Sequence, residues 1–167
     1  GTANTRDKGV NEMSSALKRR FNFETVQPIR DVALEKKIIL NEVGALAKAA
    51  GIGQKLDEEA AELLATTYHE LREGVSAEGM RIEKSACVMS TAEAISVYYQ
   101  TLMGAYYYGD GTMDPRMMVE NLVGAVAKES NEDMDKIGNY FSTVVREKAR
   151  REGGVWQKYY AARSCLK

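Results

Sequence analysis

The segment DVALEKKIILNEVGALAKAA, Asp31–Ala50, decides the fold class of this chain. Its apolar residues recur at intervals of three and four positions, which places them on one stripe of an α-helix. The stripe comprises Ile39, Val43, Leu46, Ala47 and Ala50. Gly51 follows as a helix stop. The segment therefore predicts a helix with one buried face, and similar signals recur to the end of the chain.

Two further helices are predicted next. Asp57 can cap a helix that carries acidic residues in its first turn, where the helix dipole favours negative charge. Its apolar face is formed by Leu63, Leu64, Tyr68 and Leu71, and Gly74 ends it. The stretch from Val75 to Met89 has a weak pattern and is predicted to be a loop, with a small strand pair as one option. Ser90–Glu93 has the S-x-x-E form of a capping box and opens a helix that runs to about Tyr108.

The C-terminal part contains further helix start and stop signals. Asp114-Pro115 is a helix start, and Ser130 with Asp133 opens a longer helix that ends in the basic run Arg146–Arg151. Cations in a last turn complement the helix dipole, so we interpret this run as a helix end rather than a binding patch. A short helix over Val155–Leu166 completes the chain. Residues 30–167 are thus predicted to form a helical bundle.

The first thirty residues follow a different pattern. Thr2–Asn4 is typical of a strand terminus, Asn11–Arg20 of a short helix, and Phe21–Val26 of a strand with period-two alternation. Pro28 separates this α/β piece, residues 1–29, from the helices. Because the first strand lacks its beginning and no initiator Met precedes it, we expect this chain to be part of a longer protein. The fold class is therefore mainly α, with a remnant of an α/β core in front of a helical bundle.

Composition excludes several classes of protein. The chain has 167 residues, with 23 Lys and Arg against 24 Asp and Glu, a balance that argues against a broad nucleic-acid footprint. No apolar run approaches the length of a membrane helix, and no signal peptide opens the chain. Cys87 and Cys165 lie far apart and are interpreted as free thiols. We expect a cytoplasmic protein that binds neither nucleic acid nor membrane.

Few side chains outside the N-terminal region point to chemistry. His69 is the single histidine and has no second His or nearby Cys at ligand spacing, so no metal site is predicted. The tyrosines at 98, 99 and 106–108 lack interleaved basic residues, which favours core and partly exposed faces over base stacking. A subunit interface remains an alternative for some of them.

Arg19 and Arg20 stand between the short helix and the aromatic run of Phe21 and Phe23. A planar, permanently charged guanidinium suits phosphate oxygens, and stabilising a transferring phosphoryl group is worth roughly 10³–10⁵ in rate. The same residues would also suit a solvated basic edge formed with Lys18. From the residues alone both interpretations stay open.

The first 27 residues, GTANTRDKGVNEMSSALKRRFNFETVQ, resemble the end of the ATPase core of AAA+ proteins, most closely the MoxR-like branch. That branch has an Asn at the end of a core strand, then a glycine, a short helix and an Arg-Phe pair. The resemblance implies that Asn4 positions the attacking water. It also implies that Arg20 is an arginine finger acting on a neighbouring subunit, with Arg19 the second candidate. Residues 30–167 would be the lid, matched in general layout.

The resemblance implies further parts that this chain lacks. This chain contains neither a GxxxxGK[ST] phosphate loop nor a hydrophobic strand ending in Asp-Glu, so we expect that it does not hydrolyse ATP by itself. ATP and Mg²⁺ would be held mainly by upstream residues. In that family a lid arginine often contacts nucleotide, and the best match in this sequence places Ala92 at its position. The resemblance therefore implies that either Arg81 or Lys84 substitutes for the arginine or the lid responds to nucleotide without that contact.

Two functions follow as hypotheses. One is the C-terminal part of a MoxR-like ATPase, a homo-oligomeric ring that uses ATP hydrolysis to remodel a partner protein. The resemblance suggests a chaperone-like task, often together with a protein bearing a von Willebrand factor A-type domain. The alternative is a non-enzymatic helical interaction module with no nucleotide dependence.

Overall fold

The helical body begins where Asp31 caps α2 (Val32–Ala49) in the computed structural model, which describes residues 14–84, 89–126 and 131–166. Asp31 Oδ1 accepts hydrogen bonds from the backbone N–H groups of Ala33 (2.8 Å) and Leu34 (3.2 Å). The predicted helix is therefore confirmed. Its buried stripe has a strict four-residue spacing, Glu35, Ile39, Val43 and Ala47, whereas the predicted Leu46 and Ala50 are exposed. The stripe is narrow because, among the described elements, α2 packs mainly on α3 and α4.

The next two helices have the predicted bounds. Asp57 caps α3 (Glu58–Glu73), which ends at Gly74 in the left-handed conformation (φ 73°) that glycine adopts without strain. The predicted apolar face of α3 is buried throughout: Leu63, Leu64, Tyr68 and Leu71. The capping box of Ser90 and Glu93 is formed at the start of α4 (Thr91–Tyr108). In the predicted loop between them, Val75 and Arg81 form a single antiparallel β-bridge.

The C-terminal helices follow, with one unpredicted element. α5 spans Pro115–Val126, and α6 (Asn131–Tyr140) continues through a π-helical segment, η1 (Phe141–Val145), into α7 (Arg146–Glu152). After Gly153, α8 (Gly154–Ala161) runs into a 3₁₀ segment, η2 (Ala162–Leu166). A π-helical turn carries an extra residue, which shifts the face that the following helix presents.

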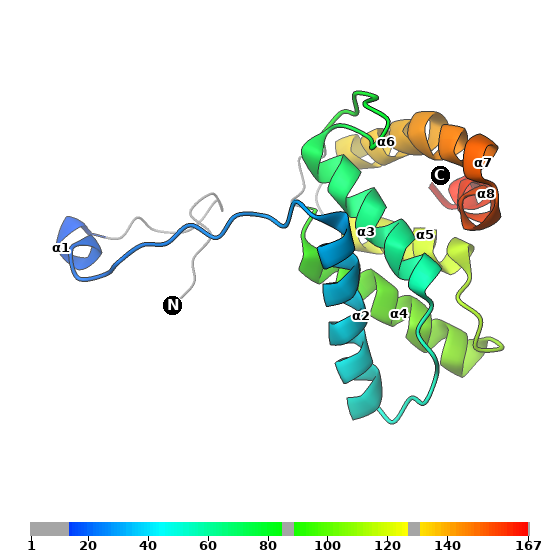
Figure 1. Cartoon of the computed structure of the whole chain (residues 1–167), viewed down its shortest axis with the longest axis horizontal. Coiled ribbons are helices and arrows are strands. Elements are labelled where there is room, and N and C mark those ends of the chain that lie inside the picture. Colours follow the sequence, from blue (N-terminus) through cyan, green and yellow to red (C-terminus); the bar gives the residue numbers. More distant parts are fainter. Residues whose placement is uncertain (1–13, 85–88, 127–130, 167) are drawn as a thin grey trace.

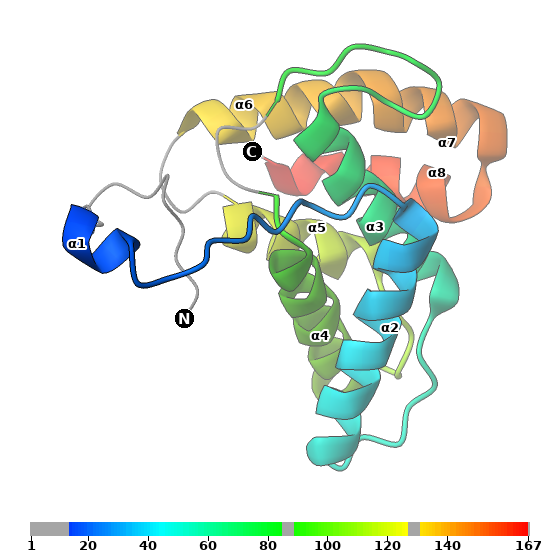
Figure 2. The same ribbon diagram turned by 60° about the vertical axis from the view of Figure 1, so that its left-hand side comes forward.

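The helices form one body with a shared core (Figures 1 and 2). α2 packs on α3 and α4, α4 packs on α5, and the pair of α7 and α8 packs against η1, α5 and α3. Tyr98 of α4 is fully buried in this core, and its hydroxyl donates to the backbone carbonyl of Asp57 (2.9 Å). None of the helices in the described parts of the chain is long and apolar enough to cross a membrane.

Residues 14–31 form an arm that extends away from the body (Figure 1). It contains the short helix α1 (Ser15–Lys18), and every residue from Ser14 to Pro28 is exposed. The predicted strand over Phe21–Val26 is wrong for this structure, because the segment is extended without forming a ladder. A strand needs a neighbouring strand to pair with, and the arm has none among the residues that the structure describes. The division at residues 29 and 30 stays a prediction.

Candidate functional site

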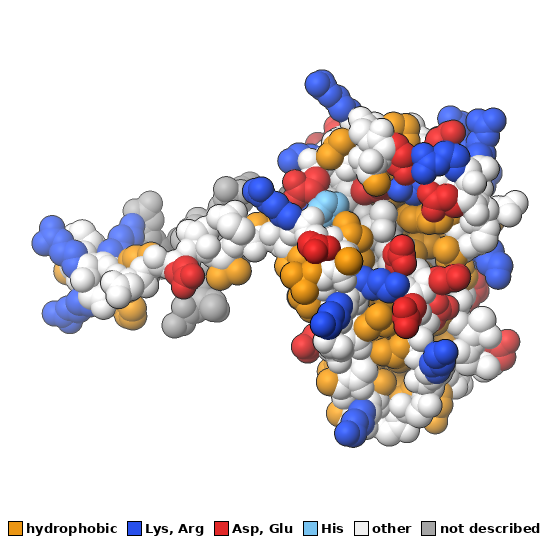
Figure 3. Space-filling model, in the orientation of Figure 1, with side chains coloured by type: hydrophobic (Ala, Val, Ile, Leu, Met, Phe, Trp, Pro, Cys, Tyr) orange, Lys and Arg blue, Asp and Glu red, His pale blue; other side chains and the backbone are white. Residues whose placement is uncertain are grey.

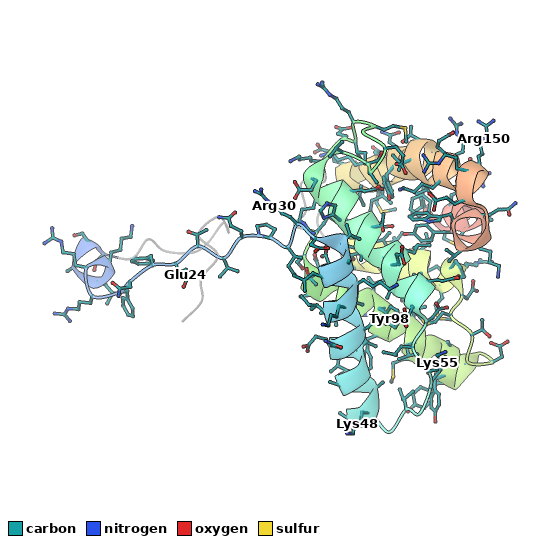
Figure 4. All side chains as sticks on the ribbon, viewed as in Figure 1. Glu24, Arg30, Lys48, Lys55, Tyr98 and Arg150 are labelled. Atoms are coloured by element: carbon teal, nitrogen blue, oxygen red, sulfur yellow. The ribbon has the colours of Figure 1, made fainter. Side chains whose placement is uncertain are left out.

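Three helix ends meet at the point where the arm enters the body. They are the N-terminus of α2, the C-terminus of α3 and the N-terminus of α4, and Arg72 of α3 lies between them. This end of the body is opposite the end of α2 that carries Lys48 (Figure 4). It is the place where the arm and the body contact one another, and so it is where the candidate site is sought.

A buried ion pair holds these helix ends together. Arg72 Nη2 lies 2.7 Å from Glu35 Oε2 and Arg72 Nη1 lies 3.1 Å from Glu35 Oε1, which is the bidentate geometry of a strong charge-assisted pair. The Glu35 side chain is 0% exposed and that of Arg72 is 12% exposed. Thr91 Oγ1 donates to Glu35 Oε1 at 2.7 Å. The carboxylate thus joins α2, α3 and α4 through named contacts.

The same guanidinium also binds two backbone carbonyls. Arg72 Nη1 donates to the carbonyl oxygen of Met89 (2.7 Å), directly before the cap of α4, and Nη2 donates to that of Ile29 (3.0 Å) in the arm. Its Nε is buried and has no hydrogen-bond partner within the described residues. We call the set of Ile29, Glu35, Arg72, Met89 and Thr91 the entry cluster.

The start of α4 is closed by its own acidic residues. Glu93 Oε2 accepts from the backbone N–H of Ser90 (3.0 Å), and Ser90 Oγ accepts from the backbone N–H of Glu93 (3.2 Å). Glu35 adds a second carboxylate beside Thr91. A helix N-terminus attracts an anion through free N–H groups, but here two carboxylates already lie around them. Ala92, exposed on the same turn, offers no cation.

A groove between α4 and α5 continues from this turn. It has a volume of about 310 Å³, and its lining includes the small residues Ala92, Gly124 and Ala125 together with Glu93 and Glu120. None of the described residues that line it is a lysine or an arginine. The described lining of the groove therefore offers no lysine or arginine to phosphate oxygens.

The predicted site residues lie on separate parts of the molecule. Asn4 is outside the described residues. Arg19 and Arg20 are exposed at the end of α1, and Figure 3 shows blue cationic side chains gathered at that end of the arm. Arg81 and Lys84 are exposed on the loop that follows α3. The structure does not bring the arm arginines together with the loop cations.

Lys84 is held in a defined place despite its exposure. A Cβ added at Gly74 would lie 2.6 Å from Lys84 Cγ and 2.8 Å from its Cε, so the lysine stem packs across the glycine that ends α3. Arg81 is fixed through its backbone pairing with Val75. Both side chains therefore present their charges from one short loop.

A second buried network was missed by sequence reasoning. Lys148 of α7 lies 3.1 Å from Glu70 Oε1 and 3.0 Å from Glu78 Oε1, and it is 5% exposed. Tyr140 donates to Glu70 Oε2 at 2.7 Å, and the backbone N–H of Ala77 donates to Glu70 Oε1 at 2.8 Å. These contacts tie the loop after α3 to α7. The basic run Arg146–Arg151 does lie at a helix end, but its single lysine, Lys148, is buried.

The network shifts the pKa values of its members. Burial alone would raise the pKa of Glu78, but hydrogen bonds from Lys148 and Ser76 and charge attraction to Lys148 lower it to about 2. Burial lowers the pKa of Lys148, yet its bonds to Glu78 and Glu70 outweigh burial and raise it. Burial and the neighbouring Glu70 carboxylate raise the pKa of Tyr140 well above its ordinary value. The charges of Glu78 and Lys148 therefore stabilise one another.

The remaining candidate residues are the histidine, the two cysteines and the tyrosines. His69 is half-buried, and the described residues contain no group of His, Cys, Asp and Glu that could hold a metal ion. Cys165 is a free thiol with its Sγ 3.6 Å from Glu120 Oε1, and Cys87 lies outside the described residues. Tyr98 is buried, whereas Tyr107 and Tyr108 are 57% and 91% exposed. An interface at these tyrosines stays a prediction.

Comparisons with known proteins identify the relatives of this chain. Residues 33–167 match the model of the YehL-like AAA+ ATPase C-terminal domain. The chain is 38% identical over 165 residues to the uncharacterized protein YehL of Escherichia coli (strain K12), a match that covers 99% of this chain and 44% of that protein. The chain thus spans less than half the length of this curated relative. No solved structure matches.

Proposed function

Because the chain belongs to the YehL-like AAA+ ATPase C-terminal domain family, we propose that it is the finger-bearing and lid part of a ring ATPase. In this proposal the full-length protein binds ATP with Mg²⁺ and hydrolyses ATP, and residues 30–167 move as the lid. Family membership over residues 33–167 is the observation that carries the proposal. The MoxR-like branch is part of the proposal and rests on the motif in the first 27 residues.

Arg20 is proposed as a finger that serves a neighbouring subunit. Its guanidinium is exposed just after α1, and α1 lies apart from the helical body in both ribbon views (Figures 1 and 2). An arginine in this position is available to an anion on another molecule, as a trans-acting finger requires. Arg19, equally exposed, is the second candidate, and Asn4 is proposed to orient the attacking water.

The lid is proposed to sense nucleotide without an arginine at the start of α4. Ala92 carries no charge, and the carboxylates of Glu35 and Glu93 surround that turn. Arg81 and Lys84, both exposed on the loop after α3, are proposed to contact phosphate from the lid in its place. ATP would supply the phosphoryl group, and Mg²⁺ would supply the positive charge that stabilises its transfer. Both ATP and Mg²⁺ would be held mainly by residues outside this chain.

The mechanical output is proposed to be remodelling of a partner protein by a homo-oligomeric ring. Hydrolysis would change the angle between the lid and the ATPase core, and Arg20 would couple neighbouring subunits. A protein with a von Willebrand factor A-type domain is the proposed partner. Co-elution of such a protein with the full-length ATPase in the presence of ATP, and its release after hydrolysis, would support that assignment.

Steady-state ATPase activity of the full-length protein tests the proposal. Arg20→Ala should lower turnover by about 10³-fold while ATP binding stays within about twofold, because a finger acts on transition-state charge. Lys18→Ala is the matched control, since it removes an exposed cation from the short helix that precedes Arg20 and should leave turnover unchanged.

Mixtures of wild-type and Arg20→Ala subunits then show where the arginine acts. Inhibition greater than dilution predicts is expected if the finger serves a neighbour. Loss of ATP binding equal to the loss of turnover would refute the finger assignment. Full activity of Arg20→Ala would leave the arginines as surface charge and favour the helical interaction module.

A further inference from the structure

We propose that Arg72 is a positioning residue that sets the direction in which the chain before α2 leaves the helical body. Under the proposed function, this direction determines the angle between the ATPase core and the lid, and in that respect the inference rests on the proposed function. The contacts of Arg72 that carry the inference involve only residues of this chain.

Among the described residues, one hydrogen bond joins a side chain of the body to the part of the arm before Asp31. Every residue from Ser14 to Pro28 is exposed, including Phe21, Phe23 and Val26 at 53%, 67% and 90%. Ile29 is half-buried, and its carbonyl oxygen accepts the hydrogen bond from Arg72 Nη2 at 3.0 Å. This hydrogen bond to Ile29 therefore lies at the border between the arm and the body.

The local backbone makes this anchor effective. Proline fixes its own φ near −65°, and it restricts the residue before it to extended conformations. Gln27-Pro28 is accordingly a stiff step directly in front of Ile29. On the other side, the Asp31 cap fixes the first turn of α2. Holding the Ile29 carbonyl thus orients the stiff segment that precedes it.

The guanidinium connects the arm to the start of α4. Its bonds to Glu35 and to the Met89 carbonyl, and the bond from Thr91 to Glu35, make one continuous set of contacts. A rotation of the arm that breaks the Ile29 contact would leave a buried guanidinium under-satisfied, which is costly. The entry cluster therefore couples the arm to the turn that carries Ala92, where no arginine is present.

Stability alone does not explain an ion pair at this place. Apolar residues of similar volume often stabilise a buried position as well as an ion pair does. They cannot, however, donate hydrogen bonds to the Ile29 and Met89 carbonyls. Arg72 fixes the direction of the backbone at Ile29, because its planar guanidinium presents N–H donors at fixed angles.

Spin-label distance measurements on this chain test the inference. With Cys87→Ala and Cys165→Ser as background, labels are placed at Gln27→Cys on the arm and Lys48→Cys at the far end of α2. A second pair, Lys48→Cys with Arg150→Cys, reports on the body alone; both positions are exposed and lie on different helices (Figure 4).

The test variant is the double substitution Glu35→Met with Arg72→Met, which replaces the buried pair by apolar side chains so that the body can still fold. We expect the 27–48 distance distribution to be narrow in the wild type and about twofold wider in the double variant, because the released backbone torsions become free. The 48–150 distribution should stay unchanged. Thr91→Val is the matched control, because it loses a contact to Glu35 but keeps the Arg72 bond to Ile29.

The outcomes separate this inference from the proposed function. A 27–48 distribution equally wide in the wild type, or unchanged in a folded double variant, would overturn the inference. If the double variant does not fold by circular dichroism, Arg72→Lys is measured instead, since it keeps the charge but lacks the fork, and the same widening is expected. ATPase activity is not read in this experiment, so failure of the finger assignment would leave its result intact.

Discussion

The hydroxyl of Tyr140 should be worth a measurable part of the free energy of unfolding. Tyr140 is 0% exposed, and its hydroxyl donates to Glu70 Oε2 at 2.7 Å. Tyr140→Phe keeps the buried ring and removes this one bond to a charged acceptor. The carboxylate keeps its contacts with Lys148 and the backbone of Ala77, so it does not become isolated.

The magnitude follows from the charge on the acceptor. A hydrogen bond to a charged group contributes about 1.5–3 kcal/mol, so we expect Tyr140→Phe to lower the free energy of unfolding by about 2 kcal/mol. For a chain of 167 residues this corresponds to a decrease in Tm of about 4–8 °C. Urea unfolding followed by circular dichroism measures the free energy, and calorimetry measures Tm.

Tyr159→Phe provides the matched control. Tyr159 is also 0% exposed and its ring packs against Phe141, but the polar neighbour of its hydroxyl is the neutral Thr67 side chain and not a carboxylate. Losing a contact between two neutral hydroxyls should cost less than losing a hydrogen bond to a charged acceptor. Equal costs for the two substitutions, or a cost below about 0.5 kcal/mol for Tyr140→Phe, would refute the assignment of the Glu70 bond as a major contact.

Two more predictions concern the loop after α3. Gly74→Ala should destabilise the chain more than Gly79→Ala, because both glycines have positive φ but only Gly74 lies against Lys84. A comparison of the urea midpoints of the two variants checks this, and equal midpoints would contradict it. Glu78→Gln should destabilise the chain at pH 7, and the difference from wild type should shrink as the pH falls from 4.5 towards 2. The lowered pKa of Glu78 means that its ionised form stabilises the fold above pH 4.5 and loses that effect as it is protonated. A difference that does not change with pH would contradict the ion-pair assignment.

Helix boundaries could be predicted well because their signals are local. Asp31, Asp57 and Ser90 satisfy backbone donors within three residues of themselves, and Gly74 ends a helix through its own φ. Such interactions depend on neighbours along the chain and not on the tertiary fold. The same holds for the apolar face of α3, where the periodicity matched burial at each predicted position.

Charged residues in the interior could not be predicted in this way. Glu35 continues the stripe of Ile39 at four-residue spacing, and this spacing was the only signal that it is buried. Lys148 stands in a basic run that is otherwise typical of a solvated helix end. A charge can be buried only where partners from other helices meet it, and those partners lie 37 residues away for Arg72 with Glu35 and 70 away for Lys148 with Glu78.

The sequence by itself thus determined that the body is helical and where most of its helices begin and end. Only the tertiary structure decided that the Phe21–Val26 segment forms no strand here, that a π-helical segment lies between α6 and α7, and that Arg72 joins the arm to three helix ends. The physical reason is range. Caps and turns are completed within a few residues, whereas sheet pairing and buried charges require groups that only folding brings together.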